Sequence, residues 1–232
     1  MKWKLDLTTA AIKDAFTEEL EASGGTISDA YDDNTRLFLR AILPRTGELG
    51  LRDHAKAGVA LRAVPDQIAV HPYVFRVVCT NGAIMAHALQ THRIEIPDWA
   101  GPETVLTSVR DGVRQCCREE AFADAAAQIR AARQSEADFA LAMMAFVSRL
   151  RAEHTSGLVE RILDRFARHE EPNRFGLMNA ITATARTVRD PEVKWRLEEL
   201  GGSVPAFQCP KSGPRPWKPR PAARADLCAT AS

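Results

Sequence analysis

The main change in the spacing of apolar residues along this chain of 232 residues comes at about residue 100. Within residues 35–96, apolar and polar side chains alternate in several short runs, which is typical of half-buried β-strands. Within residues 103–201, apolar side chains recur every three or four positions, which is typical of amphipathic helices. We therefore predict an α+β fold, in which a small antiparallel sheet in the N-terminal half packs against a helical C-terminal half.

Turn-forming residues divide the N-terminal half into short strands. Four segments have the composition of strands: residues 35–43, 57–64, 68–80 and 91–96. Proline, glycine and aspartate predict turns at residues 44–47 and 65–66. Because such short connections suit hairpins, the sheet is predicted to be antiparallel. Ahead of it, apolar residues at helical spacing predict one helix between Thr9 and Ala22.

The best-marked helix of the C-terminal half begins after Asp190. Asp190 is a favoured N-cap residue, Pro191 suits the first helical position, and Gly201-Gly202 predicts the end of the helix. Residues 1–207 are thus predicted to form a single α+β domain. Residues 208–232 are rich in proline and cannot form a core, so they predict a flexible tail.

Charge is distributed unevenly between the domain and the tail. The chain has 31 lysines and arginines against 30 acidic residues, a formal net charge of +1. The tail holds five cations and one carboxylate, so it carries +4 and the remainder of the chain carries -3. Any attraction for nucleic acid is therefore expected to be local and sensitive to salt.

Several classes of protein are not supported by the sequence. No apolar run approaches the length of a membrane span, the N-terminus does not resemble a signal peptide, and the five cysteines form no regular framework. We therefore expect a cytoplasmic protein that does not bind a membrane. Common nucleotide-binding, hydrolase and deaminase signatures are absent, so the sequence favours a non-enzymatic protein without a cofactor or metal.

Arginines alternate with apolar residues along the predicted strands. In an extended strand, Arg36, Phe38 and Arg40 lie on one face because side chains alternate with period two. Arg62 and Arg76 alternate with apolar residues on the neighbouring strands, and we predict that they share this outward face. Cations beside an aromatic ring suit phosphates and stacked bases. The competing interpretation is an ordinary solvent-facing surface, or a face that helices cover.

The tail offers a second group of cations around an aromatic residue. This group contains Arg215, Trp217, Lys218 and Arg220. It suits nucleic-acid binding, or docking to a partner protein through a polyproline helix. A disordered tail without a specific ligand is the competing interpretation.

One cysteine and two histidines raise the alternative of an enzyme or a metal site. Cys79 could be a thiolate nucleophile with His87 or His92 as its base, since a thiolate needs a neighbouring base or cation. The spacing of these three residues matches no standard zinc site. The competing interpretation is a buried free cysteine and two ordinary histidines.

Residues 76–82 read Arg-Val-Val-Cys-Thr-Asn-Gly. This string resembles the signature of a domain-of-unknown-function family (number nine-three-two), which is typical of phages, plasmids and integrated mobile elements. A strand at residues 58–62, His92 after the signature and a late helix at residues 175–182 are also similar to that family. The resemblance covers about residues 36–202. It implies a mobile-element setting and no particular activity.

Within this signature, Asn81-Gly82 also has a simple structural interpretation. Asparagine tolerates a left-handed conformation and glycine supplies positive φ, so the pair predicts a turn after a strand. Cys79 would then point inward. The competing interpretation is that Cys79, Asn81, Gly82 and His92 have a functional role.

Three functional hypotheses remain open from the sequence. The first is a mobile-element accessory protein that binds single-stranded or double-stranded DNA, or RNA, through the arginine face and the basic tail. The second is an interaction protein that acts on a host protein or on one encoded by the phage or plasmid. The third, which the sequence favours least, is a Cys/His enzyme.

Overall fold

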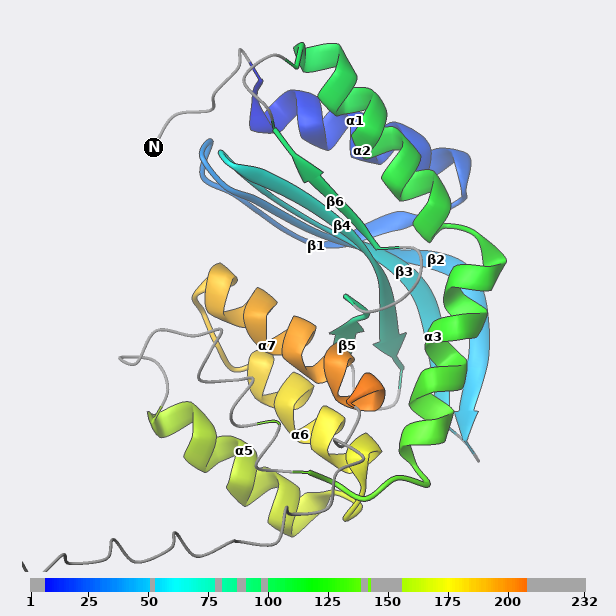
Figure 1. Cartoon of the computed structure of the whole chain (residues 1–232), viewed down its shortest axis with the longest axis vertical. Helices are drawn as coiled ribbons and strands as arrows, with labels where there is room; N and C mark the ends of the chain where they lie inside the picture. The colour runs from blue at the N-terminus through cyan, green and yellow to red at the C-terminus, as the bar shows by residue number, and fades with distance from the viewer. Residues whose placement is uncertain are drawn as a thin grey trace, which may run out of the picture.

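The structure is a computed structural model that describes residues 7–50, 53–77, 81–86, 91–96, 100–138, 142 and 156–207. It confirms the α+β class, with a curled antiparallel sheet in the N-terminal half and helices in the C-terminal half (Figure 1). The strands are β1 (Thr26–Asp32), β2 (Leu37–Gly50), β3 (Asp53–Val64), β4 (Gln67–Arg76), β5 (Asn81–Ile84) and β6 (His92–Glu95). The helices are α1 (Thr9–Ala22), α2 (Pro102–Cys116), α3 (Glu119–Ala132), α5 (Ser156–His169), α6 (Arg174–Ala185) and α7 (Pro191–Ser203), with a short 3-10 helix, η2 (Val204–Ala206), after α7.

The strands follow one another in the order β1-β2-β3-β4-β5, and β6 also pairs with β4. The predicted turn at residues 65–66 is confirmed, because Val64 pairs with Gln67 directly across it. The turn predicted at residues 44–47 is wrong. Strand β2 continues through this segment, with an irregular register between Ile42 and Thr46 that accommodates the proline.

Each face of the sheet is covered by different helices. On one face, alternate residues such as Leu39, Leu61 and Val70 join a large core with apolar residues of α1, α2 and α3. On the other face, Phe38 and Tyr73 belong to a smaller cluster with a tryptophan of α7. Figure 1 shows α1 and α2 on one side of the curled sheet and α7 on the opposite side. The sheet is therefore a middle layer where α7 crosses it.

Helix α7 begins as the sequence predicts and ends later. The Asp190 side chain accepts hydrogen bonds from the backbone N–H groups of the helix start, and Pro191 occupies the first position. Gly201 and Gly202 lie inside the helix instead of ending it. A Cβ atom on Gly202 would lie 2.0 Å from the carbonyl oxygen of Ile84, so the glycine allows α7 to approach β5.

Among the residues that the structure describes, none of the helices is long and apolar enough to span a bilayer. The expected tail, residues 208–232, lies outside the described residues.

Candidate functional site

The arginines that the sequence places on one face lie on two faces of the sheet. In the strand register, Arg62 pairs with Phe38, and Arg40 pairs with a residue of the same smaller cluster. Arg76 instead pairs with Ala55, which belongs to the large core on the other face. The prediction that Arg76 shares a face with Arg40 is therefore wrong. Almost every residue of β4 is buried, so alternation in the sequence does not distinguish its faces.

The face that contains Arg40 is covered by α7. Arg40 Nε donates to Glu198 Oε2 at 2.5 Å, and both side chains are only 3% exposed. Arg40 Nη1 donates to Asp29 Oδ2 at 3.2 Å. Phe38 is fully buried, with its ring 6.0 Å from the ring of Trp195. The predicted outward position of Arg40 and Phe38 is therefore wrong, because α7 supplies both an aromatic cover and a carboxylate.

Arg62 and Arg36 are also paired with carboxylates. Arg62 contacts Glu192 at the start of α7, with its Nη2 atom 2.9 Å from Oε1. Arg36 precedes β2 and donates from Nη2 to Asp33 Oδ2 at 2.7 Å. Each of these arginines has a neutralising partner within the protein, which leaves little positive charge to attract a phosphate.

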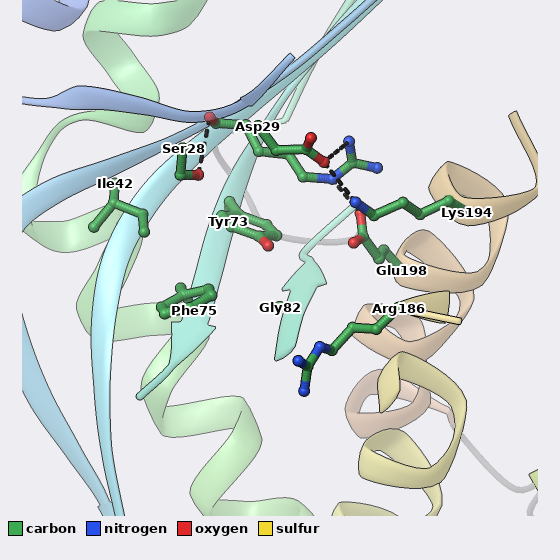
Figure 2. Close-up of a pocket in the computed structure, with 10 residues that line it drawn as sticks. Ser28, Asp29, Ile42, Tyr73, Phe75, Gly82, Arg186, Lys194 and Glu198 are labelled. Atoms are coloured by element: carbon green, nitrogen blue, oxygen red, sulfur yellow. Dashed lines mark hydrogen bonds and ion pairs between the residues drawn. The ribbon is translucent and has the colours of Figure 1, made fainter. Parts of the chain in front are cut away.

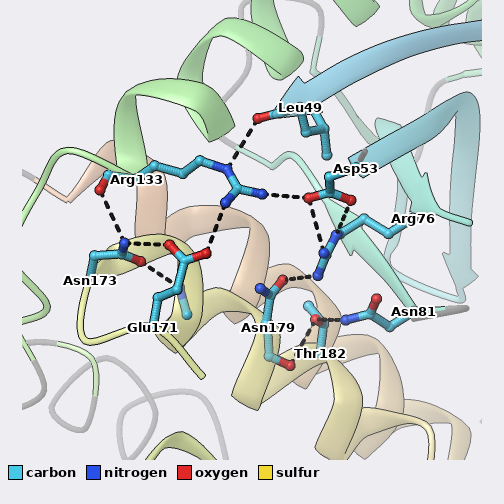
Figure 3. A network of polar contacts seen from close by, with 10 residues as sticks. Leu49, Asp53, Arg76, Asn81, Arg133, Glu171, Asn173, Asn179 and Thr182 are labelled. Atoms are coloured by element: carbon cyan, nitrogen blue, oxygen red, sulfur yellow. Dashed lines mark hydrogen bonds and ion pairs between the residues drawn. The ribbon is translucent and has the colours of Figure 1, made fainter. Parts of the chain in front are cut away.

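Arg76 belongs to a polar network that joins the sheet to α3 and α6 (Figure 3). The Asp53 carboxylate accepts from Arg76 Nη2 at 3.0 Å and from Arg133 Nη2 at 2.6 Å. Arg76 Nη1 also donates to Asn179 Oδ1 at 2.6 Å. Both guanidinium groups lie over the ring of Phe175, at 4.8 Å for Arg76 and 3.6 Å for Arg133. This network has a structural role, because each of its charged groups contacts another member of the network.

Asn81 and Gly82 form the start of β5 and not a turn. Asn81 Nδ2 donates to Thr182 Oγ1 at 2.6 Å, which attaches β5 to α6 (Figure 3). Gly82 does not have positive φ. A Cβ atom on Gly82 would lie only 1.9 Å from Tyr73 Oη. The predicted reason for this glycine is therefore wrong: its small size makes room for a tyrosine side chain.

The other predicted residues do not come together into a described site. His92 Nε2 lies 2.6 Å from Gln115 Oε1 on α2. Cys79 and His87 lie outside the described residues, so a catalytic or structural role for Cys79 stays a prediction. The tail residues Arg215, Trp217, Lys218 and Arg220 are also outside the described part. Across the described ranges, no group of three or more metal-binding side chains occurs.

A cavity of about 320 Å³ lies between the sheet and α7 (Figure 2). Its lining residues come from four strands, the end of α6 and α7: Ser28, Asp29, Arg40, Ile42, Tyr73, Phe75, Gly82, Arg186, Lys194 and Glu198. Its volume is at the lower end of the range typical of small-molecule sites. We call this cavity the sheet–α7 pocket.

Two carboxylates of the pocket are engaged by cations of the pocket. Lys194 Nζ donates to Asp29 Oδ2 at 2.5 Å, and Arg40 contacts both Asp29 and Glu198. Partial burial acts to raise the pKa of Asp29, but the hydrogen bond from Lys194 and the nearby positive charges lower it below its usual value. Deep burial raises the pKa of Glu198, against the opposing effect of Arg40. Both carboxylates are therefore part of the pocket lining, where Arg40 and Lys194 already engage them.

Tyr73 supplies a hydrogen-bond donor to the pocket. Its side chain is 4% exposed, and its hydroxyl group makes no hydrogen bond to any residue in the described part of the chain. Burial, together with the charge of Glu198, raises the pKa of Tyr73 well above its usual value. The hydroxyl group therefore stays protonated at neutral pH and can donate a hydrogen bond.

The rim of the pocket combines a cation with an aromatic ring. Figure 2 shows Arg186 extending from the end of α6 toward β5, and Phe75 on the neighbouring strand. Phe75 is partly exposed and pairs in register with Lys56 and Gly82. Three cations against two carboxylates give the pocket a formal charge of +1. The arrangement is suited to an acceptor-rich, anionic ligand with a flat apolar part.

Sequence reasoning did not identify this pocket. Tyr73, Phe75, Arg186 and Lys194 have no functional role in the sequence-based predictions. The one local sequence feature that relates to the pocket is Gly82. A side chain at this position would overlap Tyr73, which lines the pocket.

Comparison with known proteins gives no match, whether to a family model, a curated protein or a solved structure. We therefore infer the function from the chemistry of the pocket and from the sequence.

Proposed function

We propose that this protein binds nucleic acid without catalysing a reaction, as an accessory protein of a phage, plasmid or related mobile element that acts in the cytoplasm. In this proposal, a nucleic-acid strand contacts the sheet–α7 pocket and the sheet surface beside Phe75. The basic tail adds phosphate contacts. The mobile-element setting rests on the resemblance of residues 76–82.

The observation that supports binding of a nucleic-acid strand is that cations lie near the partly exposed ring of Phe75. Arg186 is exposed at the pocket, and Lys56 lies directly opposite Phe75 on β3. Phosphates attract cations, and bases stack on aromatic rings whatever the base sequence. These residues replace Arg36, Phe38, Arg40, Arg62 and Arg76 in the proposed contact, since those five side chains are paired or buried inside the protein.

A row of side chains with some exposure also crosses the sheet beside the pocket. Thr46 pairs in register with Lys56, and Lys56 pairs with Phe75, so these three residues form a row across β2, β3 and β4. Thr46 is exposed, while Lys56 and Phe75 are partly exposed. A row of exposed and partly exposed residues leads from the pocket over the surface of the sheet.

Fluorescence anisotropy with labelled single-stranded DNA, duplex DNA and RNA tests this proposal. We expect single strands to bind at about 50 mM salt and to bind much more weakly at about 200 mM, because phosphate contacts release counterions. Phe75→Leu retains an apolar side chain but removes the stacking surface, so affinity should fall about 10-fold. Phe166→Leu is the matched control, because Phe166 is also partly buried but lies on α5.

Two results would overturn the proposal. One is the absence of binding to all three nucleic acids at about 50 mM salt. The other is equal affinity of the wild type and Phe75→Leu for a single strand. Either result would favour a protein as the partner of this chain.

A further inference from the structure

We propose that the sheet–α7 pocket is a phosphate-monoester site, and that its ligand is the phosphorylated end of a nucleic-acid strand. This inference rests on the proposed function and specifies which part of the strand enters the pocket. It follows from three features: the buried side chains in the lining of the cavity, its excess of hydrogen-bond donors and its charge.

Part of the pocket lining consists of buried side chains. Tyr73, Arg40 and Glu198 line the cavity, and each is almost completely buried. A strand that continues in both directions needs two openings for its backbone, whereas a strand end needs one. A volume of about 320 Å³ is enough for a group of the size of one nucleotide. A cavity of this size, with buried side chains in its lining, suits the terminal nucleotide of a strand.

The pocket offers a ligand more hydrogen-bond donors than acceptors. The Asp29 and Glu198 carboxylates already accept hydrogen bonds from Arg40 and Lys194. The Tyr73 hydroxyl group makes no hydrogen bond to a described residue, and an ammonium group such as that of Lys194 has three donors. A ligand that fits this set must bring acceptors. A phosphate monoester brings three terminal oxygens, one more than a phosphodiester.

The charge of the pocket also suits a monoester. The lining has three cations, Arg40, Arg186 and Lys194, against the two carboxylates, which gives it a formal charge of +1. A monoester carries between one and two negative charges near neutral pH. Arg186 lies at the rim, where Figure 2 shows its side chain directed toward β5. It can contact the terminal phosphate or the next phosphate along the strand.

The experiment compares short labelled single strands that differ only at their ends. Strands with a 5′-phosphate, a 3′-phosphate or two hydroxyl ends are titrated against the full chain. We expect one phosphorylated strand to bind about 10-fold more tightly than the strand with hydroxyl ends, as for a charge-assisted hydrogen bond. Tyr73→Phe removes one oxygen atom and retains the ring, so it should remove most of this preference.

Tyr31→Phe is the matched control, because these are the two tyrosines of the chain. The Tyr31 hydroxyl group donates to Asp33 and lies outside the pocket lining. The control should therefore retain the full preference for the phosphorylated end. Far-ultraviolet circular dichroism and thermal unfolding of both variants check that each remains folded.

The outcomes separate this inference from the proposed function. Equal binding of phosphorylated and hydroxyl-ended strands by the wild type overturns the inference and leaves strand binding intact. If all strands fail to bind while adenosine monophosphate binds in a Tyr73-dependent way, the proposed function and the strand end are wrong, and the phosphate-monoester site remains. If adenosine monophosphate also fails to bind, both proposals are overturned.

Discussion

Arg40 and Glu198 are 158 positions apart in the sequence, yet they form a buried ion pair between β2 and α7 with 2.5 Å between Nε and Oε2. Removing two charges from water costs several kcal/mol per ion, and the pair offsets this cost only while both partners are present. Asp29 provides Arg40 with a second carboxylate. The arginine therefore attaches α7 to the sheet.

Glu198→Ala should lower the free energy of unfolding by about 3–5 kcal/mol, because it leaves the Arg40 guanidinium buried without its closest partner. Urea denaturation monitored by circular dichroism measures the change. Asp164→Ala is the control, since Asp164 pairs with Arg168 on the exposed surface of α5 and should contribute less than about 1 kcal/mol. Replacing Arg40 and Glu198 together by Met and Leu should recover much of the lost stability. A Glu198→Ala protein as stable as the wild type would contradict this account.

The fold class was easier to predict from the sequence than the faces of its strands. The change in apolar spacing at about residue 100 predicted the α+β class, and the helix from Thr9 to Ala22 was predicted at its observed bounds. Strand β4 is buried on both sides, so alternation separated Arg76 from Tyr73 but could not show that Arg76 is the one on the face of the large core. Strand β1 was not predicted, because it is half exposed at the edge of the sheet and contains two aspartates.

Gly82→Ala should destabilise the protein by about 1–3 kcal/mol because the new methyl group overlaps the Tyr73 side chain. The backbone at Gly82 is accessible to alanine, so the cost is steric. In a Tyr73→Ala background the same substitution should cost much less, and a double-mutant cycle of unfolding free energies measures this coupling. Gly157→Ala is the control, since a Cβ atom there contacts nothing within 4 Å. Equal costs in both backgrounds would rule out the steric explanation.

The contribution of Asp33 to stability should depend on pH. Burial acts to raise the pKa of Asp33, but hydrogen bonds from the Arg36 side chain and from nearby backbone N–H groups lower it to about 2, from an ordinary value of 3.8. A lowered pKa in the folded state stabilises the protein above pH 3.8, and this stabilisation disappears as the pH falls toward 2.

Asp33→Asn tests this dependence through urea denaturation at several pH values. The wild type should be more stable than the variant at pH 7, and the difference should decrease steadily between about pH 4 and pH 2. A difference that is constant over this range would show that the charge of Asp33 does not contribute. Arg36→Gln should reduce the difference at pH 7, because Arg36 provides two of the hydrogen bonds to this carboxylate.

Asp53→Ala should cost about 3–5 kcal/mol of unfolding free energy, because Asp53 is the carboxylate shared by Arg76 and Arg133. Its removal leaves two nearby cations facing each other over Phe175. Arg133→Lys should also destabilise the protein, since an ammonium group cannot stack on the ring and contact Asp53, Glu171 and the Leu49 carbonyl together. Denaturant unfolding measures both variants. A loss below about 1 kcal/mol for Asp53→Ala would contradict a structural role for this network.

The pocket could not be predicted from the sequence because its residues are brought together only by the fold. Asp29 and Lys194 are 165 positions apart and meet at 2.5 Å. Periodicity places a residue on a face of its own strand or helix, but it does not show which helix covers that face. The sequence therefore indicated arginines on the sheet, while the carboxylates of α7 that neutralise Arg40 and Arg62 were found only in the structure.

The basic tail gives the last prediction, which separates its contribution from that of the pocket. Truncation after Gln208 removes five cations and one carboxylate. If the tail contacts phosphates, affinity for single-stranded DNA should fall, and the slope of log affinity against log salt should decrease by up to about 3. Replacing the five tail cations by glutamine in the full chain should have the same effect, because it removes charge without shortening the chain. The preference for a phosphorylated end should survive both changes, since the pocket is intact. An unchanged salt slope in both variants would exclude the tail from strand binding.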